Sequence, residues 1–154
     1  MLDAIDLKAL RHLMNQGRMS WSDLAGRLGL SAPATAERVR RLEERGVIQS
    51  YAALVNPHAV GYGLMAFVSV NLEHPRYRDG FLQRMQELPE IQECHHVTGD
   101  DDFLLKMRCR DTGDLERLIT EGLKSVPGLL RTRTIVVLRT TKETPTLPLP
   151  DEAG

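Results

Sequence analysis

The chain opens with apolar residues spaced at the period of an α-helix, and this pattern continues as far as Gly46. The spacing predicts three helices, over residues 4–15, 21–28 and 32–45. Their ends carry residues that favour helix starts and stops, namely Asp3, Ser20 and Ser31 as amino-terminal caps and Gly29 and Gly46 as stops. Only Leu30 separates the stop of the second helix from the cap of the third, so a short turn joins these two helices.

The third predicted helix has two distinct sides. At about 100° per residue, one side carries Thr35, Val39 and Leu42 and is suited to pack against the preceding helix. The other side carries Ala34 and three arginines. Two helices joined by a short turn, the second bearing arginines, are typical of a helix-turn-helix, which places its second helix in the major groove of DNA. A charged face exposed only to solvent is the alternative, and the short turn with a fitting helix upstream favours DNA.

We therefore expect the start of this helix and its arginine side to contact double-stranded DNA. Arg38 and Arg41 are expected to reach base edges or phosphates, because guanidinium groups bind both. The full set of expected DNA-binding residues is Ser31, Ala34, Thr35, Arg38, Arg41 and Arg45.

After Gly46 the helical period gives way to extended patterns. Residues 47–55 predict a strand, and the glycine-containing segment 58–63 predicts a linker. Beyond it, the pattern predicts strands at 64–72, 91–98, 103–110 and 130–140, and helices at 76–88 and 112–124. The order βαββαβ predicts a ferredoxin-like antiparallel sheet with both helices on one face. The fold class is therefore α+β, with a three-helix helix-turn-helix domain followed by this sheet domain.

The expected domain boundaries follow from these elements: a helix-turn-helix domain at 1–50, a strand and linker at 51–63, a sheet domain at 64–141 and a flexible tail at 142–154. The sheet would have one face without helices. In the strand at 64–72, the even-numbered residues can face the helices, which leaves Met65 and Phe67 on the other face. Large apolar side chains there indicate a partner, and a second copy of the chain is the simplest one. We expect a homodimer.

Composition changes this picture little. The 154-residue chain has a net charge of −1 and 42% hydrophobic residues, which is ordinary for a soluble globular protein. It holds no apolar run near the ~20 residues of a membrane span and no signal peptide at its start, so a cytoplasmic protein without membrane contact is expected. Residues 1–60 carry eight Lys/Arg against six Asp/Glu, whereas residues 61–154 carry twelve against fifteen. The weak positive excess lies on the half expected to bind DNA.

Four residues invite a search for metal or catalytic chemistry: Cys94, His95, His96 and Cys109. Cys94 and His96 point to one face of a strand and could join Cys109, whereas His95 points to the other face. The spacing typical of zinc sites is absent, and there is no phosphate-binding loop, dinucleotide fingerprint or catalytic triad motif. We expect packing roles for these residues, no metal, no cofactor and no catalytic residues.

Three segments carry a resemblance to a known family: LSAPATAERVRRLEERGVIQSYAALVNP at 30–57, EIQECHHVTGDDDFLLKMR at 90–108 and VPGLLRTRTIVVL at 126–138. In this order and spacing, the chain resembles the Lrp/AsnC (leucine-responsive, or feast/famine) transcriptional regulators, from about residue 3 to residue 142. The resemblance implies a homodimer that assembles further to a tetramer or octamer. It also implies that the sheet domain binds a small effector, commonly an amino acid.

The resemblance places the effector near the turn between the second and third strands of the sheet domain. Carried over by position, the expected effector-binding residues are Thr98, Gly99, Asp100 and Asp102. Many relatives have an aromatic residue where this chain has Asp101, so the role of Asp101 and the identity of the effector stay open. The chemistry suits an amino acid, because a carboxylate can pair with an α-ammonium group and backbone N–H groups can bind an α-carboxylate. A solvated acidic turn is the alternative reading of the same residues.

Two other functions share this architecture. One is an enzyme similar to the sirohaem decarboxylases, in which His95 or His96 would carry the chemistry. The other is a nucleoid-organising protein that binds DNA without responding to a ligand. The arginine side of the third helix favours a DNA-binding regulator over the enzyme.

Overall fold

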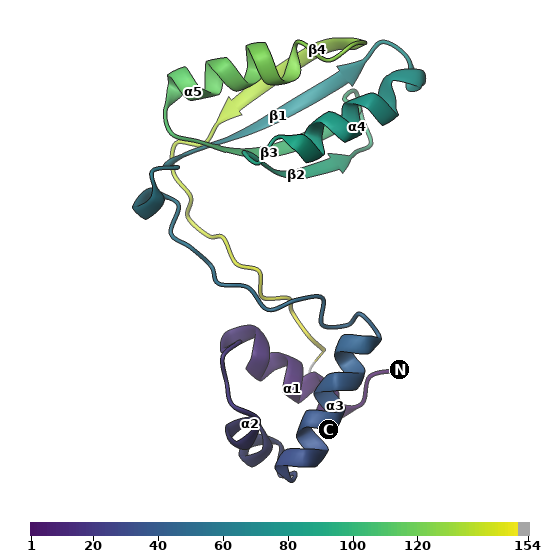
Figure 1. Cartoon of the computed structure of the whole chain (residues 1–154), viewed down its shortest axis with the longest axis vertical. Helices are drawn as coiled ribbons and strands as arrows, with labels where there is room; N and C mark the ends of the chain where they lie inside the picture. The colour runs from purple at the N-terminus through teal and green to yellow at the C-terminus, as the bar shows by residue number, and fades with distance from the viewer. Residues whose placement is uncertain (151–154) are drawn as a thin grey trace. The chain divides into compact units, whose positions relative to one another are not determined.

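A computed structural model describes residues 1–150 of the chain. It divides into two compact units, one formed by Met1–Leu54 with the segment that begins at Lys142, and the other by Val55–Thr141 (Figure 1). Each unit has its own hydrophobic core. Within the described residues, no helix is both long and apolar enough to cross a membrane.

The first unit is a three-helix bundle made of α1 (Ala4–Asn15), α2 (Trp21–Leu28) and α3 (Ala32–Glu44). The predicted caps form: the Ser20 and Ser31 side chains each accept a backbone N–H three residues on, and Gly29 adopts φ 70°, where a side chain would be strained. At α1, Asp3 and Asp6 form a complete capping box, in which each carboxylate accepts from the other residue's backbone N–H.

The core of this unit is small. Its buried cluster consists of Ala9, Leu13, Met19, Leu24, Leu28 and Val39. Leu10, Ala25 and Leu42 are also buried. Polar contacts between the helices are therefore needed, beside this apolar cluster, to hold α3 in place against α1 and α2.

The second unit is a four-stranded antiparallel sheet of strand order β2-β3-β1-β4, covered by helices on one face (Figure 1). The strands are β1 (Leu64–Leu72), β2 (Ile91–His96), β3 (Phe103–Cys109) and β4 (Leu129–Val136). The helices are α4 (Arg78–Glu87), preceded by the short helix η2 (Pro75–Tyr77), and α5 (Thr112–Arg117), which continues as the π-helical segment η3 (Leu118–Leu123). The predicted fold class, a helix-turn-helix followed by a ferredoxin-like sheet, is confirmed.

The alternation along β1 divides its side chains between the two faces of the sheet. Ala66, Val68 and Val70 lie in the core cluster with Phe81 of α4 and Leu115 of α5. Their neighbours Met65 and Phe67 belong to the opposite face, where no helix of this unit lies. Met65 is only 7% exposed and Phe67 is half-buried, but Ile135 of β4, which pairs with Phe67, is 55% exposed, so part of the apolar surface of this face lacks cover from its own unit.

The strand predicted at 47–55 is not present, and this expectation was wrong. The segment is extended but pairs with no strand among the described residues, so it lacks the ladder of backbone hydrogen bonds that defines a strand. A sequence rich in strand-forming residues cannot form a strand without a neighbour, and this segment pairs with neither edge strand of the sheet, β2 or β4. The following linker includes the short helix η1 (His58–Val60).

The segment predicted to be a flexible tail has no helix or strand between residues 142 and 150. It is grouped with the helical unit, where the Arg11 guanidinium donates to the carbonyl oxygen of Pro150. Residues 151–154 of the predicted tail lie outside the described residues.

Candidate nucleic-acid interface and effector turn

The amino-terminal end of α3 is open to solvent. Ser31 is exposed and its hydroxyl accepts the backbone N–H of Ala34 at 3.3 Å, so the serine caps the helix while its free side faces outward. Ala34 is exposed as well. A short side chain at this point allows close approach of a second molecule to the first turn of the helix, whose free N–H groups favour anions.

Thr35, expected to contact DNA, belongs to the core instead. Its side chain is 0% exposed and it lies on the same side of α3 as Val39 and Leu42, which are 1% exposed. The helical period placed all three together, and the structure shows that this side faces the other helices. Thr35 therefore presents no surface to a ligand.

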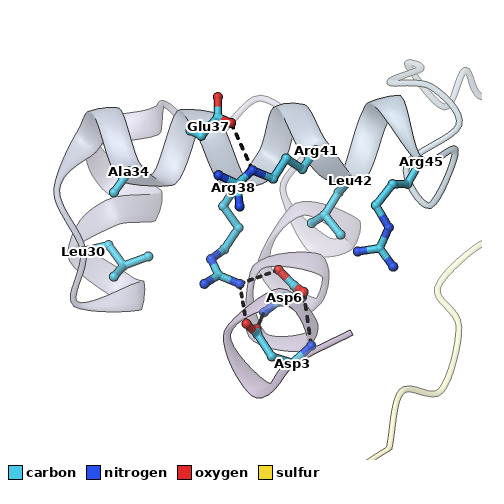
Figure 2. A pocket seen from close by; sticks show the side chains of 9 residues that line it. All are labelled: Asp3, Asp6, Leu30, Ala34, Glu37, Arg38, Arg41, Leu42 and Arg45. Carbon is cyan, nitrogen blue, oxygen red and sulfur yellow. Dashed lines mark hydrogen bonds and ion pairs between the residues drawn. The ribbon is translucent and has the colours of Figure 1, made fainter. Parts of the chain in front are cut away.

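Arg38 turns toward α1 and not outward as the sequence suggested. Its Nη1 donates to Asp3 Oδ2 at 2.6 Å and to Asp6 Oδ1 at 2.7 Å, and the Asp6 side chain is only 10% exposed (Figure 2). We call these three residues the Asp3–Asp6–Arg38 clamp. Because the two carboxylates also cap α1, the clamp ties the start of that helix to the middle of α3. Arg38 thus fixes the position of α3 against α1, and its guanidinium is not available to bind a DNA base.

A hollow of about 400 Å³ lies between α1 and α3. Figure 2 shows Arg38 crossing it to reach α1, and Arg45 pointing into it from the far end of α3. Its lining is formed by Asp3, Asp6, Leu30, Ala34, Glu37, Arg38, Arg41, Leu42 and Arg45. Charged groups thus surround an opening on the same side of α3 that carries the predicted arginines.

Two further arginines of α3 share one carboxylate. Glu37 Oε1 accepts from Arg40 Nη2 at 2.8 Å and from Arg41 Nε at 3.0 Å, while Glu37 Oε2 accepts from Arg40 Nε at 2.9 Å. Arg40 also pairs with Glu44. The hydrogen bonds from Arg40 and then Arg41 lower the pKa of Glu37 to about 2, so this carboxylate stays ionised at any physiological pH.

Arg40 is a candidate DNA contact that the sequence reasoning missed. Its side chain is 53% exposed and that of Arg41 is 67% exposed, so both lie on the solvent side of α3. The signal was present in the sequence as a glutamate three residues before Arg40 and another four residues after it, a spacing that forms ion pairs along a helix. Arg45, at the end of α3, is exposed and forms no ion pair with any of the described residues.

The expected effector residues lie together on the turn between β2 and β3. Thr98 is exposed and Gly99 has φ 104°, a conformation that only glycine adopts without strain. The backbone carbonyl of Asp100 accepts from Asn71 Nδ2 at 2.6 Å, and the exposed Asp100 carboxylate has no partner among the described residues. Asp102 Oδ2 accepts the backbone N–H of Leu72 at 2.8 Å, so this carboxylate ties the turn to the end of β1.

Asp101, whose role the sequence left open, faces two arginines of β4. Its Oδ2 lies 3.3 Å from Arg133 Nη2 and its Oδ1 lies 3.9 Å from Arg131 Nη2. Arg131 Nη2 also donates to Asn71 Oδ1 at 3.4 Å. The turn is therefore held to both β1 and β4, and guanidinium groups lie beside its carboxylates. No local pattern predicts that Arg131 and Arg133 reach this turn, because these arginines lie about thirty residues after it along the chain.

The cysteines and histidines of β2 and β3 do not gather. His95 pairs across the sheet with Leu104 and His96 with Phe103, so the two rings belong to opposite faces. His95 Nε2 lies 3.2 Å from Glu93 Oε2, and the ring of His96 lies 5.1 Å from that of Phe103. Burial raises the pKa of both cysteine thiols. Across residues 1–150 there is no group of three His, Cys, Asp or Glu side chains that could hold a metal ion.

Comparison with known proteins identifies both units. Residues 2–43 match the model of the AsnC-type helix-turn-helix domain, and residues 65–147 match that of the Lrp/AsnC ligand binding domain. The leucine-responsive regulatory proteins of Klebsiella pneumoniae and Escherichia coli strain K12 are each 44% identical over 144 residues, which cover 92% of this chain and 88% of theirs.

Solved structures agree. A transcriptional regulator from Neisseria meningitidis, solved as a complex with L-methionine, has a TM-score of 0.92 at 32% identity and covers 96% of this chain and 97% of its own. A feast or famine regulatory protein from M. tuberculosis, complexed with L-methionine, has a TM-score of 0.89 at 37% identity and covers 96% and 99%. These proteins share the order of both units over nearly the whole chain.

Proposed function

This chain belongs to the Lrp/AsnC family of DNA-binding transcriptional regulators, and from that premise we propose how its two units divide the work. Residues 1–50 bind DNA and residues 64–141 bind an effector and a second copy of the chain, with residues 51–63 joining them. The protein acts as a regulator and not as an enzyme. It acts in the cytoplasm, where it reaches the DNA that it binds.

The DNA-binding surface is the exposed side of α3. Ser31 and Ala34 approach the DNA at the start of the helix, while Arg41 and Arg45 supply positive charge further along it. Arg40 joins this set because it is exposed beside Arg41. The observation that carries the proposal is the gathering of three exposed guanidinium groups on a capped helix whose opposite side is buried in the bundle.

Replacing Arg41 with Ala is expected to weaken DNA binding about tenfold, because the exposed guanidinium loses its contact with a phosphate or a base edge. The measurement is a titration of a fluorescent duplex at several salt concentrations. Losing one phosphate contact also lowers the slope of log affinity against log salt by about 0.9. Arg84→Ala is the matched control, since Arg84 also sits on a helix in an ion pair, with Glu87, but in the other unit. Equal affinities for the Arg41→Ala variant and the unchanged protein would remove Arg41 from the interface.

The effector site is the turn formed by Thr98, Gly99, Asp100 and Asp102. An amino acid places its α-ammonium group against the exposed Asp100 carboxylate, which has no partner of its own among residues 1–150. Its α-carboxylate is received by backbone N–H groups around Gly99 and by the nearby Arg131 and Arg133. Asp102 has a supporting part, because it holds the end of β1. The relatives solved with L-methionine support an amino acid as the effector.

A thermal-shift screen of the twenty amino acids is expected to find at least one that raises the unfolding temperature. A ligand at about 100 times its dissociation constant adds about 2.7 kcal/mol of stability. Asp100→Asn removes the charge that pairs with the ammonium group and should reduce the shift by more than half. Asp79→Asn, an exposed aspartate in the first turn of α4, serves as the control and should leave the shift intact. If none of the twenty amino acids gives a shift, the sensor proposal fails and ligand-independent DNA binding takes its place.

The open face of the sheet binds a second copy of the chain. Phe67 and Ile135 lie side by side on it across β1 and β4, and Leu104 of β3 pairs with Ser69 beside them. Apolar side chains on a face that no helix covers favour a two-fold dimer, in which each copy covers the other. Such a dimer carries two copies of α3, and further assembly into a tetramer or octamer would add more. A protein whose single helical unit is only weakly basic can then bind DNA through several units together.

A further inference from the structure

Two of the three arginines proposed to contact DNA, Arg40 and Arg41, are already paired with glutamates of the same helix. Glu37 uses both carboxylate oxygens on Arg40, at 2.8 and 2.9 Å, in the two-pronged arrangement that gives arginine its strongest ion pairs. The same carboxylate binds Arg41 Nε at 3.0 Å. Glu44 takes a further N–H of Arg40 from the next turn. One residue, Glu37, therefore binds both Arg40 and Arg41, and Figure 2 shows its interaction with Arg41.

A DNA phosphate needs the same N–H groups. Phosphates bind arginine through paired N–H donors, and on Arg40 the Nε and Nη2 pair is held by Glu37. A phosphate that approaches Arg40 must therefore replace a carboxylate that is already in place, whereas a phosphate at Arg41 must share the guanidinium with Glu37, which holds its Nε. That exchange swaps one anion for another and leaves the negative charge of Glu37 close to the DNA phosphates, so it yields less than binding to an unpaired arginine.

The remaining arginines, Arg38 and Arg45, do not restore the affinity for phosphate that the ion pairs of Arg40 and Arg41 remove. Arg38 is held by the clamp with Asp3 and Asp6. Arg45 is the one arginine from α3 and its carboxyl-terminal cap that forms no ion pair within residues 1–150. A random stretch of DNA, which offers phosphates but no matching base edges, thus meets a helix whose positive charge is largely neutralised.

We propose that Glu37 is a specificity-determining residue, whose ion pairs with Arg40 and Arg41 reduce the affinity of these arginines for DNA phosphates. At the correct sequence, base edges supply extra hydrogen bonds, such as those from guanine O6 and N7 to arginine, and these make the exchange favourable. Glu37 weakens non-specific binding more than specific binding, and it thereby raises the ratio of specific to non-specific affinity. This inference rests on the proposal that α3 binds DNA.

The test uses the full chain with Glu37 replaced by Gln, which keeps the shape of the side chain and removes its charge. Binding is measured on two duplexes over a range of salt: one of scrambled sequence, and one selected by the unchanged protein from a random-sequence library. Glu43→Gln is the matched control. Glu43 lies on the same helix and carries the same charge, but it accepts from the Tyr51 hydroxyl at 2.7 Å and from no arginine.

Glu37→Gln should tighten binding to the scrambled duplex about tenfold and steepen its salt dependence by about 1, since a freed arginine releases about one more counterion. Binding to the selected duplex should gain less, so the ratio between the two falls at least threefold. Glu43→Gln should change either affinity by less than about twofold. Far-UV circular dichroism checks that each variant keeps its helices.

Two results would overturn the inference. One is a scrambled-duplex affinity for Glu37→Gln that matches the Glu43→Gln control. The other is loss of binding to the selected duplex alone, which would make Glu37 a direct base contact. Either result leaves the proposed function standing, because the unchanged protein still binds DNA. Only failure of the unchanged protein to bind any duplex would remove the proposed function itself.

Discussion

Replacing Asp6 with Ala should make the helix-turn-helix unit about 2 kcal/mol easier to unfold and should weaken DNA binding more than any single change on the surface of α3. Asp6 is the most buried member of the Asp3–Asp6–Arg38 clamp, and it also accepts the backbone N–H of Asp3. Hydrogen bonds to charged groups contribute about 1.5–3 kcal/mol, and Arg38 would lose one of its two carboxylates. The apolar core of this unit is small, so a loss of this size is a large part of its stability.

Urea unfolding followed by the fluorescence of Trp21 measures this effect. Trp21 is the only tryptophan in the chain and lies in α2, so its signal reports on the helix-turn-helix unit. Asp23→Ala is the matched control, because Asp23 is an exposed aspartate in the first turn of α2. We expect it to cost less than about 0.5 kcal/mol. Equal stabilities of the two variants would show that the clamp does not stabilise the unit.

The clamp also separates a supporting role for Arg38 from a role in contacting DNA. Arg38→Met should weaken DNA binding without changing the slope of log affinity against log salt, since no phosphate contact is lost. A direct contact would lower that slope by about 0.9.

Asp3 makes the stability of the helix-turn-helix unit depend on pH. The backbone hydrogen bond from Asp6, then the bond from Arg38, lowers the pKa of Asp3 from its ordinary value of 3.8. Its contribution to stability is therefore present above about pH 4 and is lost as the pH falls through the lowered value.

Phe67→Asp should convert the proposed dimer into a monomer. Phe67 lies near the centre of the open sheet face, beside Ile135 of β4 and opposite Lys106 of β3. A two-fold interface buries both copies of the residue, so the variant would place two carboxylates in an apolar contact. Lys106 of the same chain can pair with the new carboxylate, but burying an ion pair in an apolar contact still costs free energy because both charges lose water, and each 1.4 kcal/mol raises the dissociation constant about tenfold. The expected change in the dissociation constant of the dimer is at least a hundredfold.

Light scattering after size-exclusion chromatography gives the mass directly. The variant should have the mass of a single chain, 17.3 kDa, and the unchanged protein should have twice that mass or a higher multiple. Gln83→Asp introduces the same charge at an exposed position of α4, on the helical side of the sheet unit, and should leave the mass unchanged. A Phe67→Asp variant that stays dimeric at micromolar concentration would place the dimer contact elsewhere.

The order of helices and strands was readable from the sequence because it depends on local spacing. Caps such as Ser31, the stops at Gly29 and Gly46, and the alternation along residues 64–72 each act over a few neighbouring residues. The strand expected at 47–55 failed for the opposite reason. A strand requires a partner, and whether one is available depends on the rest of the fold.

Within the candidate site, the sequence determined which residues share a side of α3, since the helical period fixes their angles. It did not determine the direction of Arg38, because a long side chain at the border between two sides goes to whichever partner is nearest. Asp3 and Asp6 are that partner, and they lie more than thirty residues earlier. The same holds for Asp101, whose arginines come from a strand thirty residues later. The sequence alone thus determined the two units, their elements and the charged helix, all of which follow from local periodicity. The tertiary structure decided which arginines are free to meet DNA, because ion pairs form between side chains that only folding brings together.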